Sequence, residues 1–485
     1  MINYRRIFKN SVFITTGLLI DGFILFIVGV LSARYLGVET FGYFILILTI
    51  VNLFQILANG GMVNITIREI ARTKEQTQKI LSATLTLAIL ILSILFLLIH
   101  IGLIFFQPEP HLKTTIYLLS LSALITIHAA LHAAVLRAYE DMLRVAVTAL
   151  SQKITLLLSV LVAIHFDWGI EGIAYAYFMA SLVNWLIYFI WVKIFYVRIT
   201  WLIDLNYWQF LIKEAIPLGV SMLLRRVTIH TDTFLLAIFS TVIAVGLFNS
   251  AYQPIQMLEG AILALSGVLF PVFSRLAKES MPDFQHLFSL SVRFFIILSA
   301  PLVVWLLLLS QALISLIYGA AYQEASGVLA VLGFTLFFLM PGALFFAVFS
   351  ALNRQRLFLL LTAIGFIINV SLDILLIPRY DYLGAAIATF LTEAIVFISG
   401  AFLLYRLKIT VNYLSIYLRS LLAIVVPSIL LWLCVQTDNY GLITLGSFFY
   451  LIIYFWMVVL VRLIGKKELY FFRNLLNRKT SMMKS

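Results

Sequence analysis

The chain has 485 residues, of which 63% are hydrophobic and only 11% are charged, and its mean hydropathy is +1.09. This composition excludes a water-soluble protein, because a soluble chain needs far more charged side chains to cover its surface. The net charge of +12 does not indicate nucleic-acid binding, since no stretch is long and polar enough to form a basic soluble domain.

Long apolar runs follow one another along the chain and lack the alternation of β-strands. Backbone N–H and C=O groups in hydrocarbon must be hydrogen-bonded within the protein, so these runs predict membrane-spanning helices rather than a barrel. Five prolines in the later runs predict kinks inside long helices: Pro217, Pro254, Pro271, Pro301 and Pro341. The fourteen predicted spans cover residues 11–33, 40–65, 80–106, 114–136, 145–166, 170–192, 214–239, 243–274, 285–309, 325–352, 357–378, 383–405, 415–435 and 441–464.

The basic residues fall mainly on one side of this layout. Most of the 33 Lys and Arg residues lie in loops of one side or near the termini, whereas the loops of the other side hold only Arg34, Lys113 and Arg379. Cytoplasmic loops of membrane proteins carry the excess of Lys and Arg. We therefore expect a multi-pass protein of the cytoplasmic (inner) cell membrane with both termini in the cytoplasm.

Two segments resemble each other at a nearly constant offset of about 212 residues. Since six predicted spans separate the copies, the repeats share one orientation, as in transporters built from parallel repeats. Chance similarity between helices rich in Ala and Gly is the alternative. We expect an N-terminal lobe (1–200), a C-terminal lobe (201–410), two accessory spans (411–465) and a basic cytoplasmic tail (466–485). The matching residues are Ala134, Val135, Ala138, Arg144 and Gly172-Ile173-Ala174 in the first copy, and Ala347, Val348, Ala351, Arg356 and Gly384-Ala385-Ala386 in the second.

Cations inside the predicted spans are the first candidate site, since a charged residue costs roughly 3 kcal/mol to insert into a membrane. Arg225 and Arg226 lie about 18 Å along their span, too deep for their side chains to reach water. Lys153 and Arg293 lie nearer the cytoplasmic ends of spans 5 and 9, one in each lobe. A cleft that collects all four would bind a diphosphate, which guanidinium groups hold in a bidentate way. The alternative is a salt-bridge network in which Asp232 neutralises Arg225.

Acids inside the spans are candidates for coupling transport to an ion. Burial favours the protonated form of a carboxyl group, so these residues can exchange H+ or bind Na+. Asp21 and Glu393 have no cation in the same helical turn, and a hydrogen bond between helices is their alternative role. We expect no cofactor and no metal site, because His128 and His132 have i, i+4 spacing but no third ligand. The candidate coupling residues are Asp21, Glu393, Asp232, Glu259 and Asp373.

Several short motifs follow one another in a characteristic order. They are Ala33-Arg34-Tyr35-Leu36-Gly37-Val38-Glu39-Thr40-Phe41-Gly42-Tyr43, Arg68-Glu69-Ile70-Ala71-Arg72, Asp232, Val245-Gly246-Leu247-Phe248 with Ala251, Tyr318-Gly319 with Tyr322 and Ala325, and Ile377-Pro378-Arg379-Tyr380 with Gly384-Ala385-Ala386-Ile387-Ala388-Thr389. From about residue 5 to 410 the chain resembles the polysaccharide (O-antigen and teichoic acid type) exporters and flippases of the multidrug/oligosaccharidyl-lipid/polysaccharide exporter superfamily. It departs from their pattern at Phe248, where Tyr is usual, and at Asp381, where Gly is common.

The resemblance implies two six-helix lobes around a central cavity, working by alternating access. It also implies a substrate, an oligosaccharide on polyprenyl diphosphate, that moves from the cytoplasmic to the exterior leaflet. We therefore expect a lipid-linked oligosaccharide flippase for surface polysaccharide synthesis, and not an enzyme. Membrane lipids are the expected surroundings, a glycan polymerase and glycosyltransferases are candidate partners, and no nucleic acid is expected.

Two other functions remain open. A cation-coupled multidrug exporter of the same superfamily would have acids rather than arginines dominating its central cavity. A membrane glycosyltransferase or polysaccharide polymerase would need a catalytic carboxylate or arginine on a large exterior loop. No predicted exterior loop is longer than about 15 residues, which disfavours this second alternative.

Overall fold

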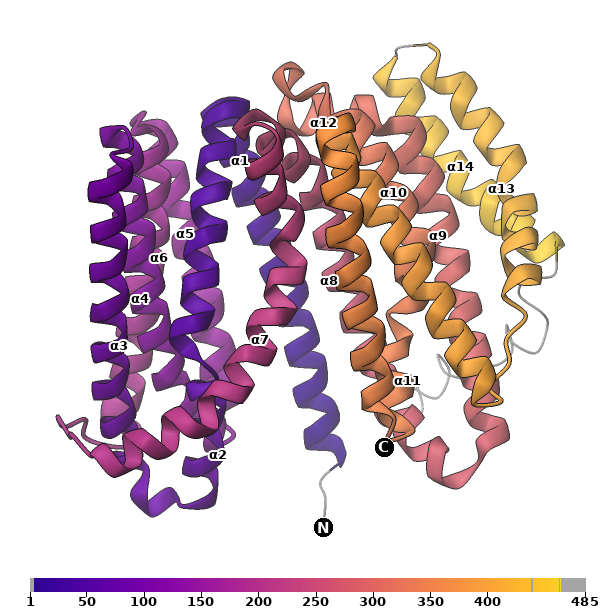
Figure 1. Ribbon diagram of the computed structural model, residues 1–485. Coiled ribbons are helices and arrows are strands. Elements are labelled where there is room, and N and C mark those ends of the chain that lie inside the picture. Colours follow the sequence, from indigo (N-terminus) through magenta and orange to yellow (C-terminus); the bar gives the residue numbers. More distant parts are fainter. Residues whose placement is uncertain (1–3, 438, 462, 464–485) are drawn as a thin grey trace, which may run out of the picture. The chain divides into compact units, whose positions relative to one another are not determined.

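The computed structural model describes residues 4–437, 439–461 and 463, and it describes side chains from residue 20 onward except at positions 57, 58, 106, 217, 218, 220–229 and 440. All regular secondary structure in this part of the chain is helical (Figure 1). The elements are α1 (Tyr4–Asn59), α2 (Met62–Arg72), η1 (Lys74–Gln76), α3 (Thr77–Phe106), α4 (Pro110–Ala138), α5 (Met142–His165), α6 (Gly169–Phe195), α7 (Leu205–Phe239), α8 (Val242–Glu279), α9 (Met281–Tyr318), η2 (Ala320–Tyr322), α10 (Ala325–Gly342), α11 (Leu344–Ala351), α12 (Gln355–Arg406), α13 (Tyr413–Val435) and α14 (Tyr440–Leu460).

Each predicted span corresponds to a helix, a helix pair or half of a helix. α1 holds the first two spans and breaks at Gly37 (φ 74°, ψ 172°), and α12 holds the eleventh and twelfth spans and breaks at Asp381 (φ 53°, ψ −137°). The second span was predicted to reach residue 65, but α1 ends at Asn59. The reason is that Gly60 and Gly61 both have positive φ, 48° and 83°, which ends a right-handed helix.

Four of the five prolines that were predicted to kink helices have described side chains, and all four lie inside helices. Pro254 and Pro271 lie within α8, Pro301 within α9 and Pro341 within α10, which ends one residue later. A proline removes one hydrogen bond of the helix interior, so it locally weakens a long helix. Pro217 lies in α7, but its side chain is outside the described set.

The described helices form two compact units. The first comprises Met1–Ala264, Ile317–Tyr322 and Leu372–Ala385, and within it α6 packs against α4 and α5 while α1 packs against α4, α5 and α7. The second comprises Leu265–Leu316, Gln323–Ser371 and Ala386–Ser485, and within it α13 packs against α14. The division into lobes at residues 200 and 410 stays a prediction, and the basic tail 466–485 lies outside the described residues.

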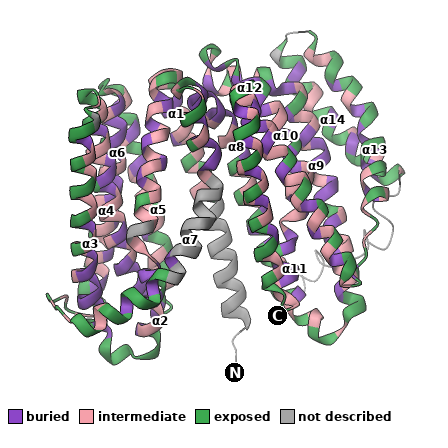
Figure 2. Cartoon of the chain, viewed as in Figure 1, coloured by how far each residue is buried: buried purple, intermediate pink, exposed green. Residues whose placement is uncertain are grey.

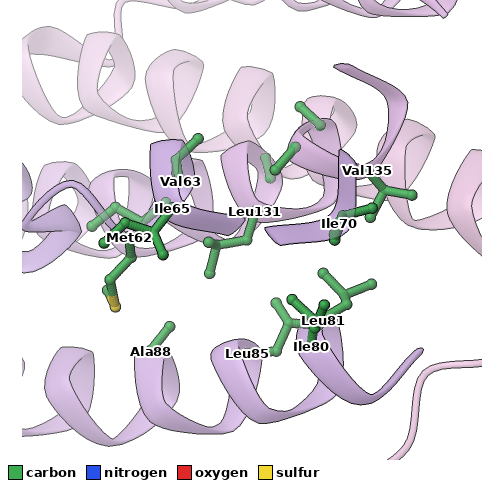
Figure 3. Close-up of a cluster of buried hydrophobic side chains, with 14 of the residues drawn as sticks. Met62, Val63, Ile65, Ile70, Ile80, Leu81, Leu85, Ala88, Leu131 and Val135 are labelled. Atoms are coloured by element: carbon green, nitrogen blue, oxygen red, sulfur yellow. The ribbon is translucent and has the colours of Figure 1, made fainter. Parts of the chain in front are cut away.

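A buried apolar cluster fixes the short helix α2 in the first unit (Figure 3). Ile65 and Ile70 of α2 are buried against Leu81 and Leu85 of α3 and Leu131 of α4. Burial of one such side chain contributes about 1.5–3 kcal/mol. The cluster therefore holds α2 against the ends of two long helices.

Long helices also carry exposed apolar faces. On α3, where Figure 2 shows exposed residues mixed with buried and intermediate ones, Leu97, Leu98 and Phe105 have 56%, 54% and 80% of their surface exposed. Such faces are unfavourable in water and suit hydrocarbon, where lipid is the solvent. Eleven segments of the described chain are long and apolar enough to cross a membrane. The chain is thus an all-α, multi-pass membrane protein.

Candidate functional site

A polar cavity of about 290 Å³ lies within the first unit between α1, α7 and α8, with Tyr177 contributed by α6. No Asp, Glu, Lys or Arg is among its described lining residues. The described lining therefore combines uncharged hydrogen-bonding groups with apolar side chains. The polar lining residues, apart from Tyr177, are Ser32, Thr49 and Asn52 of α1, His230 and Thr233 of α7, and Asn249, Gln253 and Gln256 of α8.

Three amide side chains line the cavity from a single face of α8. Asn249, Gln253 and Gln256 are spaced i, i+4 and i+7, which places them on one side of a helix. Ala251 and Ile255 between them are fully buried. Amide groups are costly in hydrocarbon, so an aligned row of them inside a predicted span indicates a polar space. This spacing of amides is visible in the sequence, but the candidates predicted from the sequence inside the spans were all charged residues.

Contacts with neighbouring helices hold two of these amides in place. Asn249 Nδ2 donates to Thr233 Oγ1 at 3.1 Å and to the Val245 carbonyl oxygen at 2.9 Å. Gln253 Oε1 accepts from the hydroxyl of Tyr318 at 3.2 Å. The Gln253 amide packs directly against Gly29 of α1, and a Cβ at position 29 would collide with this amide. Asn249 and Gln253 are thus oriented before any ligand arrives.

Ser32 supplies an unsatisfied hydroxyl to the same cavity. Its side chain is only 1% exposed, and among the described residues its Oγ has no hydrogen-bond partner. Buried polar atoms are normally hydrogen-bonded, so an orphan hydroxyl on a cavity wall indicates a site for a ligand or water. Hydroxyls and amides each offer donors and acceptors, the combination that binds sugar hydroxyl groups.

The predicted cation Lys153 is already paired. Its Nζ on α5 lies 3.2 Å from Oδ1 of Asp21 on α1, and the two side chains are 18% and 38% exposed. Asp21 was predicted to have no cation in its own turn, and its partner comes from a different helix. The spacing of residues along the sequence predicts contacts within one helix but not between helices, so the pair of Lys153 and Asp21 was not predicted.

The other predicted cations lie elsewhere. Arg293 of α9 belongs to the second unit, where its Nη1 donates to the Leu463 carbonyl oxygen at 3.4 Å. Arg225 and Arg226 lie in the continuous helix α7, but their side chains are outside the described set. Arg226 precedes the lining residue His230 by one helical turn, and so shares its face of α7. Whether the four cations meet in one cleft stays a prediction.

Two of the predicted acids meet inside the first unit. Asp232 of α7 is 6% exposed and Asp373 of α12 is fully buried, and their carboxyl groups interact electrostatically. Apart from the Asp232 carboxyl itself, Asp373 has no hydrogen-bond donor among the described residues. Two carboxyl groups so placed repel each other when both are ionised, so the protonation of one depends on the charge of the other.

The remaining predicted residues are separate from this pair. Glu259 of α8 accepts a hydrogen bond from the Tyr252 hydroxyl at 3.4 Å, and Glu393 is half-buried in the second unit. His132 Nδ1 lies 2.7 Å from the carbonyl oxygen of His128, one turn earlier in α4. Within the described residues, no group of three or more His, Cys, Asp or Glu side chains has the geometry of a metal site.

The motif that contains Ala33 and Tyr35 fixes one end of the first unit. The Tyr35 hydroxyl donates to Asp167 Oδ1 at 2.7 Å and accepts from the Gly169 backbone N–H at 2.7 Å. The Tyr322 hydroxyl donates to the Ala33 carbonyl oxygen at 2.8 Å. This motif therefore joins the break in α1 to the α5–α6 connection and to η2.

Comparisons with known proteins place these features in context. Residues 7–277, more than half of the chain, match the model of a family described as "Polysaccharide biosynthesis protein". The capsular polysaccharide biosynthesis protein CapF of Staphylococcus aureus is 27% identical over 189 residues, which are 38% of this chain and 47% of CapF. The probable low-salt glycan biosynthesis flippase Agl15 of Haloferax volcanii is 25% identical over 165 residues, which are 34% of this chain and 35% of Agl15.

These alignments span about a third to a half of the curated relatives. A solved structure of the lipid II flippase MurJ, in an inward closed conformation, superposes with a TM-score of 0.75 at 18% identity. The superposition covers 97% of this chain and 100% of the MurJ chain. At this level of identity the likeness concerns the fold.

Proposed function

Because the chain belongs to the family of polysaccharide biosynthesis proteins, we propose that it is a flippase for a polyprenyl-diphosphate-linked oligosaccharide. It moves this lipid across the cytoplasmic membrane by alternating access, with both of its own termini in the cytoplasm, and so serves surface polysaccharide synthesis. The cavity between α1, α7 and α8, whose described lining combines amide and hydroxyl groups without a charged residue, is the observation that carries the proposal.

The cavity suits the sugar part of the substrate. Amide and hydroxyl groups bind the alternating donors and acceptors of a sugar ring, while Phe26, Phe41 and Phe44 supply apolar surface for its C–H faces. The volume of about 290 Å³ is near the lower end for ligand sites, so the cavity holds part of an oligosaccharide rather than all of it.

Arg225 and Arg226 are our candidates for the diphosphate. Arg226 shares a face of α7 with His230, so a diphosphate bound there would adjoin sugars in the cavity. Lys153 can contribute only by leaving Asp21, its present partner. Arg293 remains a candidate from the second unit.

The pair Asp232 and Asp373 is our candidate for coupling to H+ or Na+. Asp373 is fully buried and its carboxyl group interacts with that of Asp232, so binding of a proton or a monovalent cation at Asp373 would change how α7 and α12 interact. α7 also carries His230 and Thr233 of the cavity, so one helix would connect the ion to the substrate.

Two features support a flippase over its rivals. A cavity for cationic drugs would carry acids, and none is among the described lining residues. A glycosyltransferase would need an extended catalytic loop outside the membrane. The longest connection between described helices runs only from Tyr196 to Asp204.

Flipping of a fluorescent lipid-linked oligosaccharide in proteoliposomes tests the proposed sugar subsite. Gln256→Leu and Gln253→Leu should slow flipping about tenfold each, the cost of one or two lost hydrogen bonds. Gln436→Leu makes the same exchange at an exposed position outside the cavity and should leave the rate unchanged. Wild-type rates for both cavity variants would rule out the sugar subsite.

The diphosphate clamp has its own test. Arg225→Gln or Arg226→Gln should each abolish export of the surface glycan at normal protein levels. Export that survives replacement of both arginines by Ala would show that the diphosphate is held elsewhere, and would leave the sugar subsite standing.

A further inference from the structure

A second hollow lies on the first unit, away from the residues of the polar cavity. It is a groove of about 820 Å³ between the end of α5 and the beginning of α6. Leu158 and Val162 of α5 and Ala176 and Met179 of α6 make most of it apolar. Its faces belong to helices that are long and apolar enough to cross the membrane, so the groove opens to lipid.

Aromatic rings and one acid stand at the end of this groove. Trp168, Glu171 and Tyr175 line it where α6 begins, and the two rings are 51% and 46% exposed. Gly172 explains the position of Trp168, because a Cβ at this glycine would collide with the Trp168 side chain and press on Ala163. Trp and Tyr side chains concentrate at the headgroup level of membrane proteins, which places this end of the groove at the membrane surface.

Glu171 is the only charged residue among the described residues of the groove, and no ion pair or hydrogen bond joins its carboxylate to the rest of the described chain. A carboxylate at the membrane surface attracts a cationic headgroup, and no Lys or Arg among the described lining residues competes for it. Trp168 and Tyr175 also attract cations through their ring faces. Charge and shape together therefore describe a ligand with a cationic head and an apolar tail.

We propose that this groove binds a phospholipid with an ammonium headgroup. The ammonium lies against Glu171 and the aromatic rings, and one acyl chain follows Val162, Leu158 and Met179 into the membrane. The indole N–H of Trp168 and the hydroxyl of Tyr175 are donors for the lipid phosphate. An anionic lipid such as phosphatidylglycerol has no ammonium group to pair with Glu171. Its phosphate is repelled by the Glu171 carboxylate, so we expect it to bind more weakly. With the termini in the cytoplasm, the site faces the outer leaflet.

Native mass spectrometry of the purified full-length protein tests the site. Dioleoyl-phosphatidylethanolamine and dioleoyl-phosphatidylglycerol are each titrated and the bound fractions compared. The wild type should prefer the ethanolamine lipid, and Glu171→Gln should lower its affinity about fivefold, as for loss of one partly screened ion pair. Glu39→Gln, which removes an exposed acid outside the groove, should leave the preference intact.

Met179→Trp separates the two halves of the site. It fills the apolar part without changing charge, so it should reduce binding of the ethanolamine lipid while Glu171 remains. The proposal is overturned by equal binding of both lipids to the wild type, or by a Glu171→Gln variant that keeps the full preference. It is also overturned by equal losses for both lipids in Glu171→Gln, which would indicate a structural role for the acid.

Discussion

Gly42 of α1 and Gly246 of α8 pack against each other at the point where the two helices cross. A Cβ at Gly42 would collide with the Val242 carbonyl oxygen, and a Cβ at Gly246 would collide with the Val38 carbonyl oxygen and lie 3.3 Å from the Gly42 nitrogen. These obstacles are backbone atoms, which cannot rotate away. Two motifs about two hundred residues apart in the sequence are thus the two halves of one helix contact.

Replacing either glycine should therefore destabilise the protein. We expect Gly42→Ala and Gly246→Ala each to cost about 1–3 kcal/mol of stability, because overpacking against backbone forces the helices apart. Thermal unfolding in detergent, followed by size-exclusion chromatography, measures the effect. Gly102→Ala in α3 is the matched control, because a Cβ there meets nothing within 4 Å. Equal stability of all three variants would contradict the contact.

Asp381 occupies a backbone conformation that favours glycine. Its φ of 53° is strained for a side chain, and its Oδ1 accepts a hydrogen bond from the Ser240 hydroxyl. Asp381→Gly removes the strain and the hydrogen bond together, whereas Asp381→Ala keeps the strain and loses the bond. We expect Asp381→Gly to be at least as stable as the wild type and Asp381→Ala to be about 1–2 kcal/mol less stable.

Unfolding midpoints of the two Asp381 variants provide the check. The order Gly, wild type, Ala is expected. An Ala variant as stable as the Gly variant would show that the backbone conformation does not matter, and an Ala variant as stable as the wild type would show that the bond to Ser240 does not matter.

The ion pair between Lys153 and Asp21 should show energetic coupling. Lys153→Met leaves the Asp21 carboxylate without its cation, and Asp21→Asn leaves the ammonium without its acid. The double variant leaves neither charge behind, so its loss of stability should be smaller than the sum of the single losses by about 1 kcal/mol. Lys113→Met, at an exposed lysine, is the control for loss of a cation. Strictly additive losses would mean that the pair does not contribute.

Asp141 should make stability depend on pH at the membrane surface. It caps α5 outside the span. Burial alone would raise the pKa of Asp141, but the Tyr196 hydroxyl at 2.7 Å, the Arg144 backbone N–H and the Arg144 guanidinium hold that pKa below its usual 3.8. A carboxylate with a lowered pKa stabilises the fold above its unfolded pKa, and this contribution is lost as the pH falls through the folded value.

The unfolding midpoint of the wild type should therefore decline below about pH 4. Asp141→Asn keeps an oxygen for the helix cap but cannot titrate, so its midpoint should fall less steeply over the same range. Parallel pH profiles for the two proteins would assign the acid sensitivity to other groups.

The sequence alone determined the class of this protein and the course of its helices. Length and hydropathy of each apolar run decide whether a helix can span a membrane, and both are local properties. The spans, the intramembrane prolines and the candidate charges could therefore be listed in advance. The break at Gly60 and Gly61 was missed, because two small residues inside an apolar run do not interrupt its hydropathy.

Only the tertiary structure decided which of those residues meet. It paired Lys153 with Asp21 and Asp232 with Asp373, and it gathered neutral amides from α8 around a cavity with Ser32 of α1 and Thr233 of α7. Periodicity along one helix fixes which face a residue occupies, but it does not fix which helix packs there. That choice depends on shape, as at Gly42 and Gly246, where the absence of two side chains lets α1 and α8 touch.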